Sequence, residues 1–273
     1  MPAVHRRAVL LIVTGVLATV LQPVWTARAD GAPRATGTFF WANAWAAHHT
    51  EARGGAAPGA ERMRRLVRLV HRDDVHLGTL AEIEHSQVAA FRKAAPEYSL
   101  LTADRGNTDG VFWLTDGYDV VETYRFRAFT YGGRRSPVPV AVLRDRVSGA
   151  LLAVIAVHNP RDRWRDRALR RELEEVRRLR HVHGSDLSVF MAGDFNAGAS
   201  VACRAHRARL YSAGHRRCDS YAPIDQLLVD RHVRIRAYHR MTGARVHRIT
   251  DHPAVYRARF AIADAPVPSG RRR

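Results

Sequence analysis

Short apolar stretches alternate with polar segments along the chain, and this pattern predicts a protein built around buried strands. The strongest apolar run lies at 151–157, and runs at 38–45, 75–81 and 187–192 predict three further inner strands. Shorter runs predict the remaining strands, at 98–102, 111–114, 120–124, 138–144, 224–229, 233–239 and 254–260.

Three other segments repeat their apolar residues every three or four positions, which is typical of amphipathic helices. Residues 61–71 and 86–95 predict two of these helices, and Pro96 ends the second. Residues 162–183 predict a long charged helix that Gly184 ends. Strands mixed with a few helices predict an α+β or α/β sandwich, with sheets inside and helices outside.

Polar residues that could carry chemistry lie at the ends of these strands. Asp194 and Asn196 follow the run at 187–192, and residues at alternate positions point to the same side of a sheet. Other strand ends contribute the rest of the set: Asn43, Glu82, His158, Asp225, Asp251 and His252. A polar turn or a surface carboxylate would explain any one of them, so only their joint occurrence favours a site.

This set of side chains suits the hydrolysis of a phosphate ester. Five of them offer hard oxygen ligands that favour Mg²⁺ or Mn²⁺ over zinc: Asn43, Glu82, Asp194, Asn196 and Asp251. An ion held there would neutralise the phosphoryl oxygens and stabilise the leaving alkoxide.

Two histidines are predicted to handle protons. His252 would take a proton from water as general base, with Asp225 orienting its imidazole. His158 would donate a hydrogen bond or a proton on the other side of the phosphate, although a satisfied strand-end histidine is an equally good interpretation. The remaining polar residues near these positions are expected to be solvated: His48, His49, Glu84, His85, His181 and His183.

The two ends of the chain are predicted to lie outside the folded domain. Residues 1–29 have a basic start, an apolar stretch and the small-x-small site Ala27-Arg28-Ala29, which are typical of a Sec or twin-arginine export signal. Residues 30–37 predict a flexible leader, and residues 263–273 predict a disordered basic tail. We therefore expect a secreted monomer, cleaved near Ala29, with one catalytic domain at 38–262 and no stable membrane insertion.

The charge balance favours a polyanionic partner. The chain has 44 Lys and Arg against 26 Asp and Glu, a formal charge of +18. Loss of Arg6, Arg7 and Arg28 with the predicted signal removes three positive charges and leaves +15. Nucleic acid or a membrane with acidic lipids would suit such a protein. A GC-rich genome would explain the preference for Arg over Lys, but not the excess over acids.

Cys203 and Cys218 are the only two cysteines. Export into an oxidising compartment favours a disulfide between them, and two free thiols are the alternative.

With its motifs in order, the sequence resembles the endonuclease/exonuclease/phosphatase superfamily from Phe39 to Phe260. Residues 193–197 match the family's Gly-Asp-x-Asn motif, and Thr250-Asp251-His252-Pro253 matches its closing Ser-Asp-His motif. Weaker matches place Asn43 and Glu82 at the family's first-strand asparagine and metal-binding glutamate. His158 with Pro160 matches the histidine strand end, and Asp225 matches the acid that pairs with the catalytic histidine.

The resemblance implies a four-layer α/β sandwich of two packed mixed β-sheets flanked by helices, and metal-dependent phosphoester hydrolysis. Glu82 would then hold the metal with Asn43 and Asp251, while Asp194 and Asn196 would contact metal, water or the scissile phosphate. Arg135 resembles the phosphate-binding arginine of deoxyribonucleases, and the cysteines resemble the disulfide of the pancreatic-type enzyme. Asp109 is the predicted partner of His158.

We interpret the chain as a secreted phosphodiesterase dependent on Mg²⁺ or Mn²⁺, with Ca²⁺ as a further option, and as a nuclease acting on DNA or RNA by endo or exo attack. Glu84 stands where a deoxyribonuclease would place an arginine, which argues against DNA, and Ala81 replaces the family's usual glutamine. The alternatives are a sphingomyelinase-type lipid phosphodiesterase, for which 124–131 is the nearest exposed aromatic hairpin, and a phosphatase on small phosphoesters. A non-catalytic binding protein on the same scaffold is the remaining class.

Overall fold

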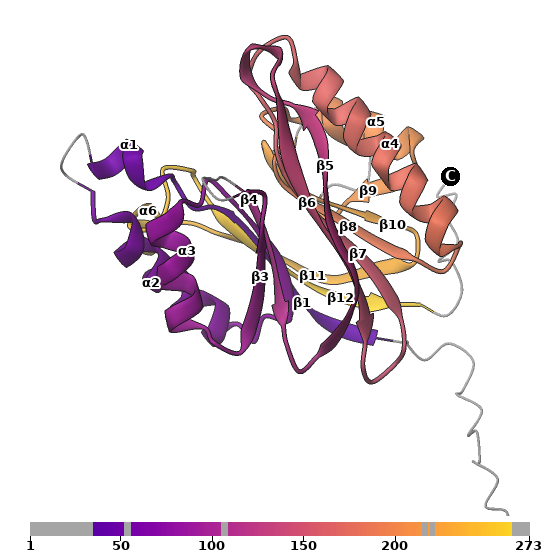
Figure 1. Ribbon diagram of the computed structural model, residues 1–273, viewed down its shortest axis with the longest axis horizontal. Helices are drawn as coiled ribbons and strands as arrows, with labels where there is room; N and C mark the ends of the chain where they lie inside the picture. The colour runs from indigo at the N-terminus through magenta and orange to yellow at the C-terminus, as the bar shows by residue number, and fades with distance from the viewer. Residues whose placement is uncertain (1–34, 52–55, 105–108, 215–217, 219–221, 264–273) are drawn as a thin grey trace, which may run out of the picture. The chain divides into compact units, whose positions relative to one another are not determined.

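Two six-stranded sheets form the centre of the computed structural model, which describes residues 35–51, 56–104, 109–214, 218 and 222–263 (Figure 1). The predicted signal at 1–29 and the tail from 264 onward lie outside the described residues. Within the described part, no helix is long and apolar enough to span a membrane.

The first sheet has the strand order β11-β12-β1-β2-β4-β3. Its strands are β1 (Ala35–Asn43), β2 (Leu77–Ala81), β3 (Tyr98–Thr102), β4 (Asp109–Leu114), β11 (Val233–Met241) and β12 (Val255–Ile262). Only β1 and β2 pair in parallel, and every other neighbour is antiparallel. The first and last strands of the chain, β1 and β12, are therefore direct neighbours.

The second sheet has the order β5-β6-β7-β8-β10-β9. Its strands are β5 (Tyr118–Phe129), β6 (Arg135–Asp145), β7 (Leu151–His158), β8 (Ser188–Asp194), β9 (Leu210–Ser212) and β10 (Asp225–Asp230). Here too one parallel pair, β7 and β8, lies between antiparallel neighbours. The carboxyl ends of a parallel pair meet at one edge of a sheet, so each sheet brings two strand ends together at its centre.

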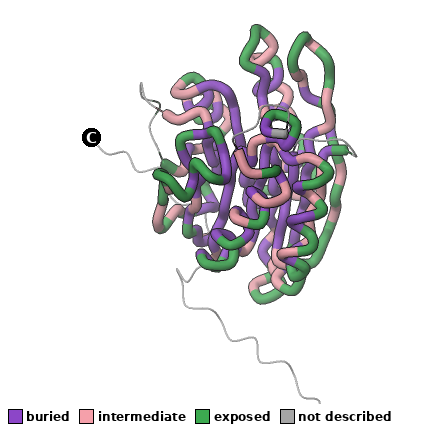
Figure 2. Tube along the Cα trace, turned by 90° about the vertical axis from the view of Figure 1, so that its left-hand side faces the viewer, coloured by how far each residue is buried: buried purple, intermediate pink, exposed green. Residues whose placement is uncertain are grey.

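The faces that the two sheets turn toward each other are apolar. The Phe39 ring of β1 stacks on the Phe190 ring of β8 at 5.3 Å, and Phe190 meets Phe260 of β12 edge to face at 4.9 Å. Residues from both sheets make one buried cluster around these rings. The strands are buried along most of their length, and exposed residues gather on the outer helices and turns (Figure 2).

Helices cover the outer face of each sheet. α2 (Gly59–Arg72) and α3 (His85–Ala94) pack on the first sheet, with Phe91 against Phe112. α4 (Arg165–His183) and α5 (Ala199–Arg207) pack on the second. Three short elements complete the fold: α1 (Ala47–Glu51), the 3₁₀ turn Tyr131–Gly133 and α6 (Ala244–His247). The predicted four-layer α/β sandwich of two mixed sheets is confirmed.

Some predicted boundaries were wrong. β1 begins at Ala35, so residues 35–37 pair with β12 and do not belong to a flexible leader. β5 reaches Phe129 because its residues up to Phe129 pair with β6, which is only one residue shorter. α4 begins at Arg165 rather than 162, because the Asp162 carboxylate accepts the backbone N–H of Gly132 and of Trp164.

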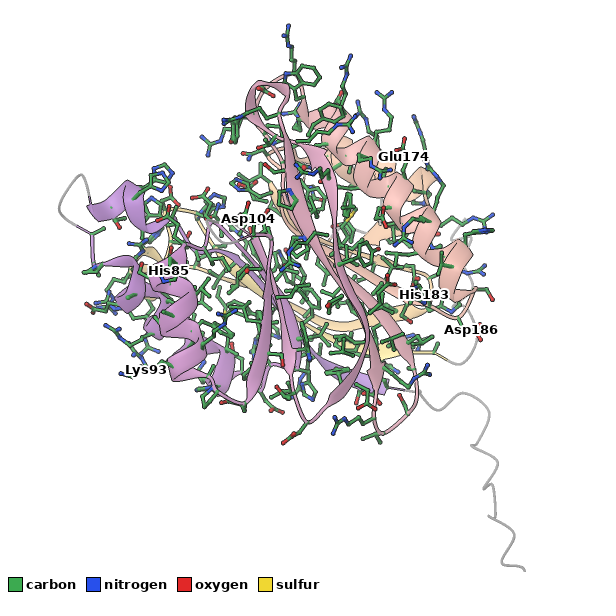
Figure 3. All side chains as sticks on the ribbon, viewed as in Figure 1. His85, Lys93, Asp104, Glu174, His183 and Asp186 are labelled. Atoms are coloured by element: carbon green, nitrogen blue, oxygen red, sulfur yellow. A yellow bond between two sulfur atoms is a disulfide. The ribbon has the colours of Figure 1, made fainter. Side chains whose placement is uncertain are left out.

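Two residues expected to be solvated have charged partners. His48 Nδ1 lies 2.5 Å from Oε1 of Glu84. His183, at the end of α4 (Figure 3), lies 3.3 Å from Oε2 of Glu122 on the neighbouring β5. The predicted disulfide between Cys203 and Cys218 is present and joins α5 to the segment before β10.

Candidate active site

The carboxyl ends of the two central parallel pairs carry four of the predicted residues. Asn43 ends β1 and Glu82 directly follows β2 in one sheet, while His158 ends β7 and Asp194 ends β8 in the other. Asp225 begins β10 and pairs in register with Asp194. His252 reaches the same place from the loop before β12, so six residues from six separate segments come together.

His252 is buried and oriented by Asp225. Its Nδ1 lies 2.7 Å from Oδ2 of Asp225, which is also buried. With the Nδ1 proton donated to that carboxylate, Nε2 carries the lone pair and accepts the Asn43 side-chain N–H at 3.1 Å. The ring is therefore held in the tautomer that can receive a proton on the side facing the cluster.

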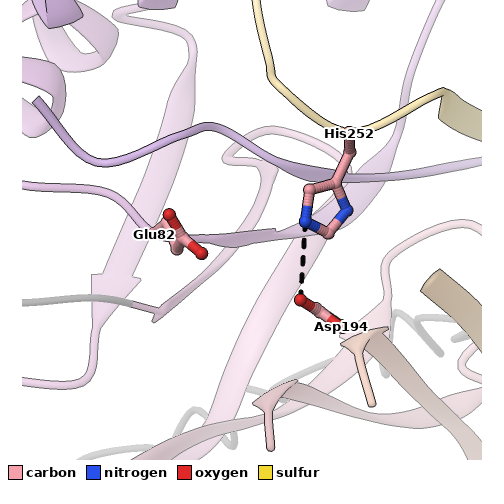
Figure 4. A group of neighbouring side chains, drawn as sticks. All are labelled: Glu82, Asp194 and His252. Atoms are coloured by element: carbon pink, nitrogen blue, oxygen red, sulfur yellow. Dashed lines mark ion pairs between the residues drawn. The ribbon is translucent and has the colours of Figure 1, made fainter. Parts of the chain in front are cut away.

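Glu82, Asp194 and His252 form a candidate metal site (Figure 4). One ligand atom from each lies within 4.8 Å of the other two. Oδ2 of Asp194 is buried and has no hydrogen-bond partner among the described residues, although it lies 3.6 Å from Nε2 of His252. An unpaired buried carboxylate oxygen is costly, and a divalent cation would satisfy it, so the residues present fit such an ion.

Burial and charge at this site shift several pKa values, among them those of His252, Glu82 and Asp109. Burial lowers the pKa of His252, but the Asp225 hydrogen bond and the charges of Asp225, Asp194 and Asp251 outweigh it and raise the pKa to about 9. Burial raises the pKa of Glu82, yet His158, Asn43 and the Ala46 N–H together hold it below its usual value.

Asp109 is the third of these groups. Burial raises the pKa of Asp109 to about 7, even though His158 opposes the shift. The acids around the site therefore differ in how readily they ionise. Glu82 stays charged over the physiological range, which suits a metal ligand.

His158 faces three carboxylates. Its Nε2 lies 3.5 Å from Glu82 and 3.7 Å from Asp194. Its Nδ1 lies 3.9 Å from Oδ1 of Asp109, the residue predicted as its partner. That distance is an ion-pair contact rather than a hydrogen bond.

Asn196 is held between the loops that follow β7 and β8. Its side-chain N–H donates to the backbone oxygen of Asn159 at 2.7 Å, and its Oδ1 accepts from Arg161 at 3.0 Å. Its backbone N–H donates to Oδ1 of Asp194 at 2.8 Å. Asn196 therefore joins the β7 and β8 loops and orients Asp194.

The sequence reasoning missed the residues that hold this loop. Arg165 donates to the backbone oxygen of Asn196 at 3.0 Å, and Asn159 donates to Glu172 at 3.1 Å. Burial raises the pKa of Glu172 to about 8. Arg161 could have been found, because it directly follows His158-Asn159-Pro160. Glu172 could not, because the sequence pattern does not distinguish it from the other acids of a charged helix.

Two predicted site residues lie outside the cluster. Asp251 is exposed and acts on His252 through its charge. Arg135 is exposed at the start of β6, and its guanidinium lies over the Phe129 ring at 5.1 Å. It contacts none of the clustered residues in the part of the chain that the structure describes.

Arg135 instead ends a stack of four side chains beside the site. The Phe129 and Trp164 rings are nearly parallel, with centroids 5.2 Å apart. The Arg167 guanidinium lies over the Trp164 ring at 4.7 Å. The stack fixes the turn that carries Tyr131. Burial raises the pKa of Tyr131, as do the charges of Asp194 and Glu82, so this turn faces the cluster.

Comparisons with known proteins place these observations in context. The sequence model of the Endonuclease/Exonuclease/phosphatase family matches residues 39–252. No curated protein matches the chain. Among solved structures, an endonuclease/exonuclease/phosphatase family protein from Bacteroides thetaiotaomicron has a TM-score of 0.70 at 16% identity, over 86% of this chain and 100% of that one.

Two further structures are similar. A mannosyl-6-phosphatase from Bacteroides thetaiotaomicron has a TM-score of 0.64 at 16% identity, over 82% of this chain and 98% of that one. D. rerio TDP2, complexed with a single-strand DNA product, has a TM-score of 0.59 at 15% identity, over 83% of this chain and 99% of that one. At these identities the likeness shows a shared fold.

Proposed function

Because this chain belongs to the endonuclease/exonuclease/phosphatase family and is a metal-dependent phosphoester hydrolase, we propose that it cleaves phosphodiester bonds in nucleic acid. The observation that carries the hydrolytic part is the unpaired Oδ2 of Asp194, which lies between the two histidines. The preference for nucleic acid is supported by the formal charge of +18 and by a relative, D. rerio TDP2, whose structure holds single-strand DNA.

The cluster residues divide the chemistry between them. Glu82 and Asp194 would hold Mg²⁺ or Mn²⁺, which when bound would neutralise the phosphoryl oxygens and lower the raised pKa of His252. The neutral His252 ring takes a proton from the attacking water at Nε2, and Asp225 stabilises the imidazolium that results. His158 donates a hydrogen bond to the phosphate from the opposite side.

We further propose that the protein works outside the cytoplasm. The export pattern at 1–29 supports this, and so does the disulfide between Cys203 and Cys218, because such bonds persist in oxidising compartments. Outside the cell, a basic protein would attract dissolved nucleic acid, which is a polyanion, and this is consistent with the proposed substrate.

Nicking of supercoiled plasmid and degradation of single-stranded RNA test the proposal. Cleavage should need Mg²⁺ or Mn²⁺, stop with chelator and vanish in His252→Ala. His239→Ala removes a histidine from β11 and is the matched control, which should cleave as the unchanged protein does. Metal-dependent hydrolysis of a simple aryl phosphodiester without any cleavage of DNA or RNA would overturn the nucleic-acid substrate while leaving the hydrolase in place.

A phosphatase acting on small phosphoesters is the second candidate, because the similar mannosyl-6-phosphatase shares the fold. A panel of sugar and inositol phosphates assayed with each metal separates the two. In the hairpin of the sphingomyelinase alternative, Phe126 is buried and Phe129 is held in the stack with Trp164, whereas Tyr131 is 42% exposed. The hairpin therefore presents one exposed aromatic side chain, and phosphocholine release from sphingomyelin vesicles tests this alternative.

A further inference from the structure

A groove lined by arginines lies between α2 and α6, apart from the catalytic cluster. Its volume is about 440 Å³, and Leu69 and Ile249 form its apolar part. Its other lining residues are all arginines: Arg65, Arg68, Arg72, Arg245 and Arg248. No acid lines the groove, so the space between the helices is strongly positive.

Three of these arginines have no counter-charge. Arg65 pairs with Glu61 one turn earlier, and the Arg72 side chain pairs with Asp73 at 2.9 Å. Among the described residues, no carboxylate lies within 4.0 Å of Arg68, Arg245 or Arg248.

The spacing of these arginines is unfavourable without an anion. Arg65, Arg68 and Arg72 follow one another at i,i+3 and i,i+4 on one face of α2, and Arg245 and Arg248 are three apart on the facing segment. Like charges at these spacings destabilise a helix. An anion bound between the two segments would relieve that repulsion on both.

The groove lies within reach of the catalytic histidine. Arg248 precedes His252 by four residues, which limits the distance between their Cα atoms to about 14 Å. The Arg65 side chain donates to the backbone oxygen of Arg248 at 3.3 Å and so fixes α2 against this segment. One strand of duplex DNA advances about 3.4 Å per nucleotide along the helix axis, so this limit corresponds to at most about four nucleotides of a duplex.

We propose that the arginine groove binds backbone phosphates of a nucleic acid strand within about four nucleotides of the bond that is cleaved. The inference rests on the proposed function and adds a subsite to it. Planar guanidinium groups match phosphate oxygens through paired N–H donors, and several of them along one groove suit a chain of regularly spaced charges. The groove therefore favours long substrates over short ones.

The triple substitution Arg68→Gln, Arg245→Gln and Arg248→Gln tests this subsite. Binding of a labelled 20-nucleotide single strand is measured in chelator, where no cleavage occurs. We expect about tenfold weaker binding and a salt dependence of log K that is shallower by about two, since each lost phosphate contact removes about 0.7.

A matched control removes the same charge elsewhere. Arg170→Gln, Arg177→Gln and Arg207→Gln neutralise three exposed arginines on α4 and α5, which cover the other sheet. Equal losses in both triple variants would show a general charge effect and overturn the groove. The proposal would also be overturned if the groove arginines were needed for binding to anionic lipid vesicles and not for binding to the oligonucleotide.

Catalytic measurements separate this inference from the proposed function. Hydrolysis of bis(4-nitrophenyl) phosphate and of a dinucleotide should be the same in the groove variant and the unchanged protein, because neither substrate spans the distance. For the 20-nucleotide strand, the groove variant should have a higher KM and an unchanged kcat. If the unchanged protein cleaves no nucleic acid, the proposed function fails, while the binding comparison still decides whether the groove holds the strand.

Discussion

His252 and Asp225 form a buried pair, with Nδ1 of the ring 2.7 Å from the carboxylate. Asp225 begins β10, in register with Asp194, whereas His252 comes from the loop before β12. The pair therefore joins the two sheets at the edge where the other catalytic groups lie, and it sets both the tautomer and the orientation of the ring.

Asp225→Asn should remove most of the activity without disturbing the fold. An amide N–H in place of the carboxylate favours the wrong tautomer of His252, and the equivalent change in a serine protease triad costs about 10⁴ in kcat. We expect a fall in kcat of about 10³ or more with little change in KM, measured on the aryl phosphodiester. A loss of less than tenfold would contradict the assignment of His252 as base.

Metal titrations should separate Asp194 from Asp251. Asp194→Asn removes a buried oxygen of the cluster, so half-maximal activity should need far more Mg²⁺. Asp251→Asn changes an exposed residue outside the cluster and should shift that concentration less than threefold. An equal shift in both variants would place Asp251 among the metal ligands, as the family resemblance implies.

Trp164→Ala should loosen the turn that carries Tyr131. The substitution removes the ring between Phe129 and Arg167, and with it packing worth about 1–2 kcal/mol for a half-buried aromatic. We expect a Tm several degrees lower and reduced activity, while Trp164→Phe keeps both near the original values. Full activity in the destabilised alanine variant would show that the stack supports the hairpin alone.

Glu172→Gln should change how stability depends on pH. The pKa of Glu172 is raised to about 8 by burial, from an unfolded value near 4.5, so the folded state holds a proton that the unfolded state loses. In the unchanged protein this stability is present below about pH 4.5 and is lost as the pH rises through about 8.

The glutamine variant keeps the contact with Asn159 and carries no proton to lose. Urea unfolding at pH 5 should give similar stabilities for the two proteins, and at pH 9 the variant should be more stable by ~2 kcal/mol or more. The same difference at both pH values would contradict a protonated Glu172.

Reduction of the disulfide should cost stability but not the catalytic cluster. Cys203 and Cys218 are 15 residues apart, and closing a loop of that length contributes about 3 kcal/mol in the chain-entropy model. The double Cys→Ser variant should unfold at lower denaturant and be insensitive to dithiothreitol. We expect the kcat of that variant to be unchanged, because the disulfide is not part of the catalytic cluster.

Much of this fold follows from pattern alone. The apolar runs ending in Asn43, His158 and Asp194 predict inner strands, and polar residues at the ends of buried strands have few structural explanations. α5 and β9 were not predicted because both are short, and nine and three residues are too few for a local pattern to stand out. Their structure depends on packing against the second sheet, which a local pattern does not contain.

The roles of individual site residues were harder to predict. Asn196 belongs to the most recognisable motif, yet its side chain spans to Asn159 and Arg161 because its positive φ of 48° turns it toward the β7 loop. Arg135 lies in a phosphate-binding pattern, but its guanidinium packs over the Phe129 ring. In each case contacts with other parts of the fold decide where the side chain points.

The pairing of β1 with β12 has a consequence for biosynthesis. The proposed general base, His252, precedes β12, the strand that pairs with β1. A ribosome-bound chain from which residues 252–262 have not yet emerged lacks both the proposed proton acceptor and the neighbour of β1. The hydrolytic site is therefore complete only after synthesis has passed β12.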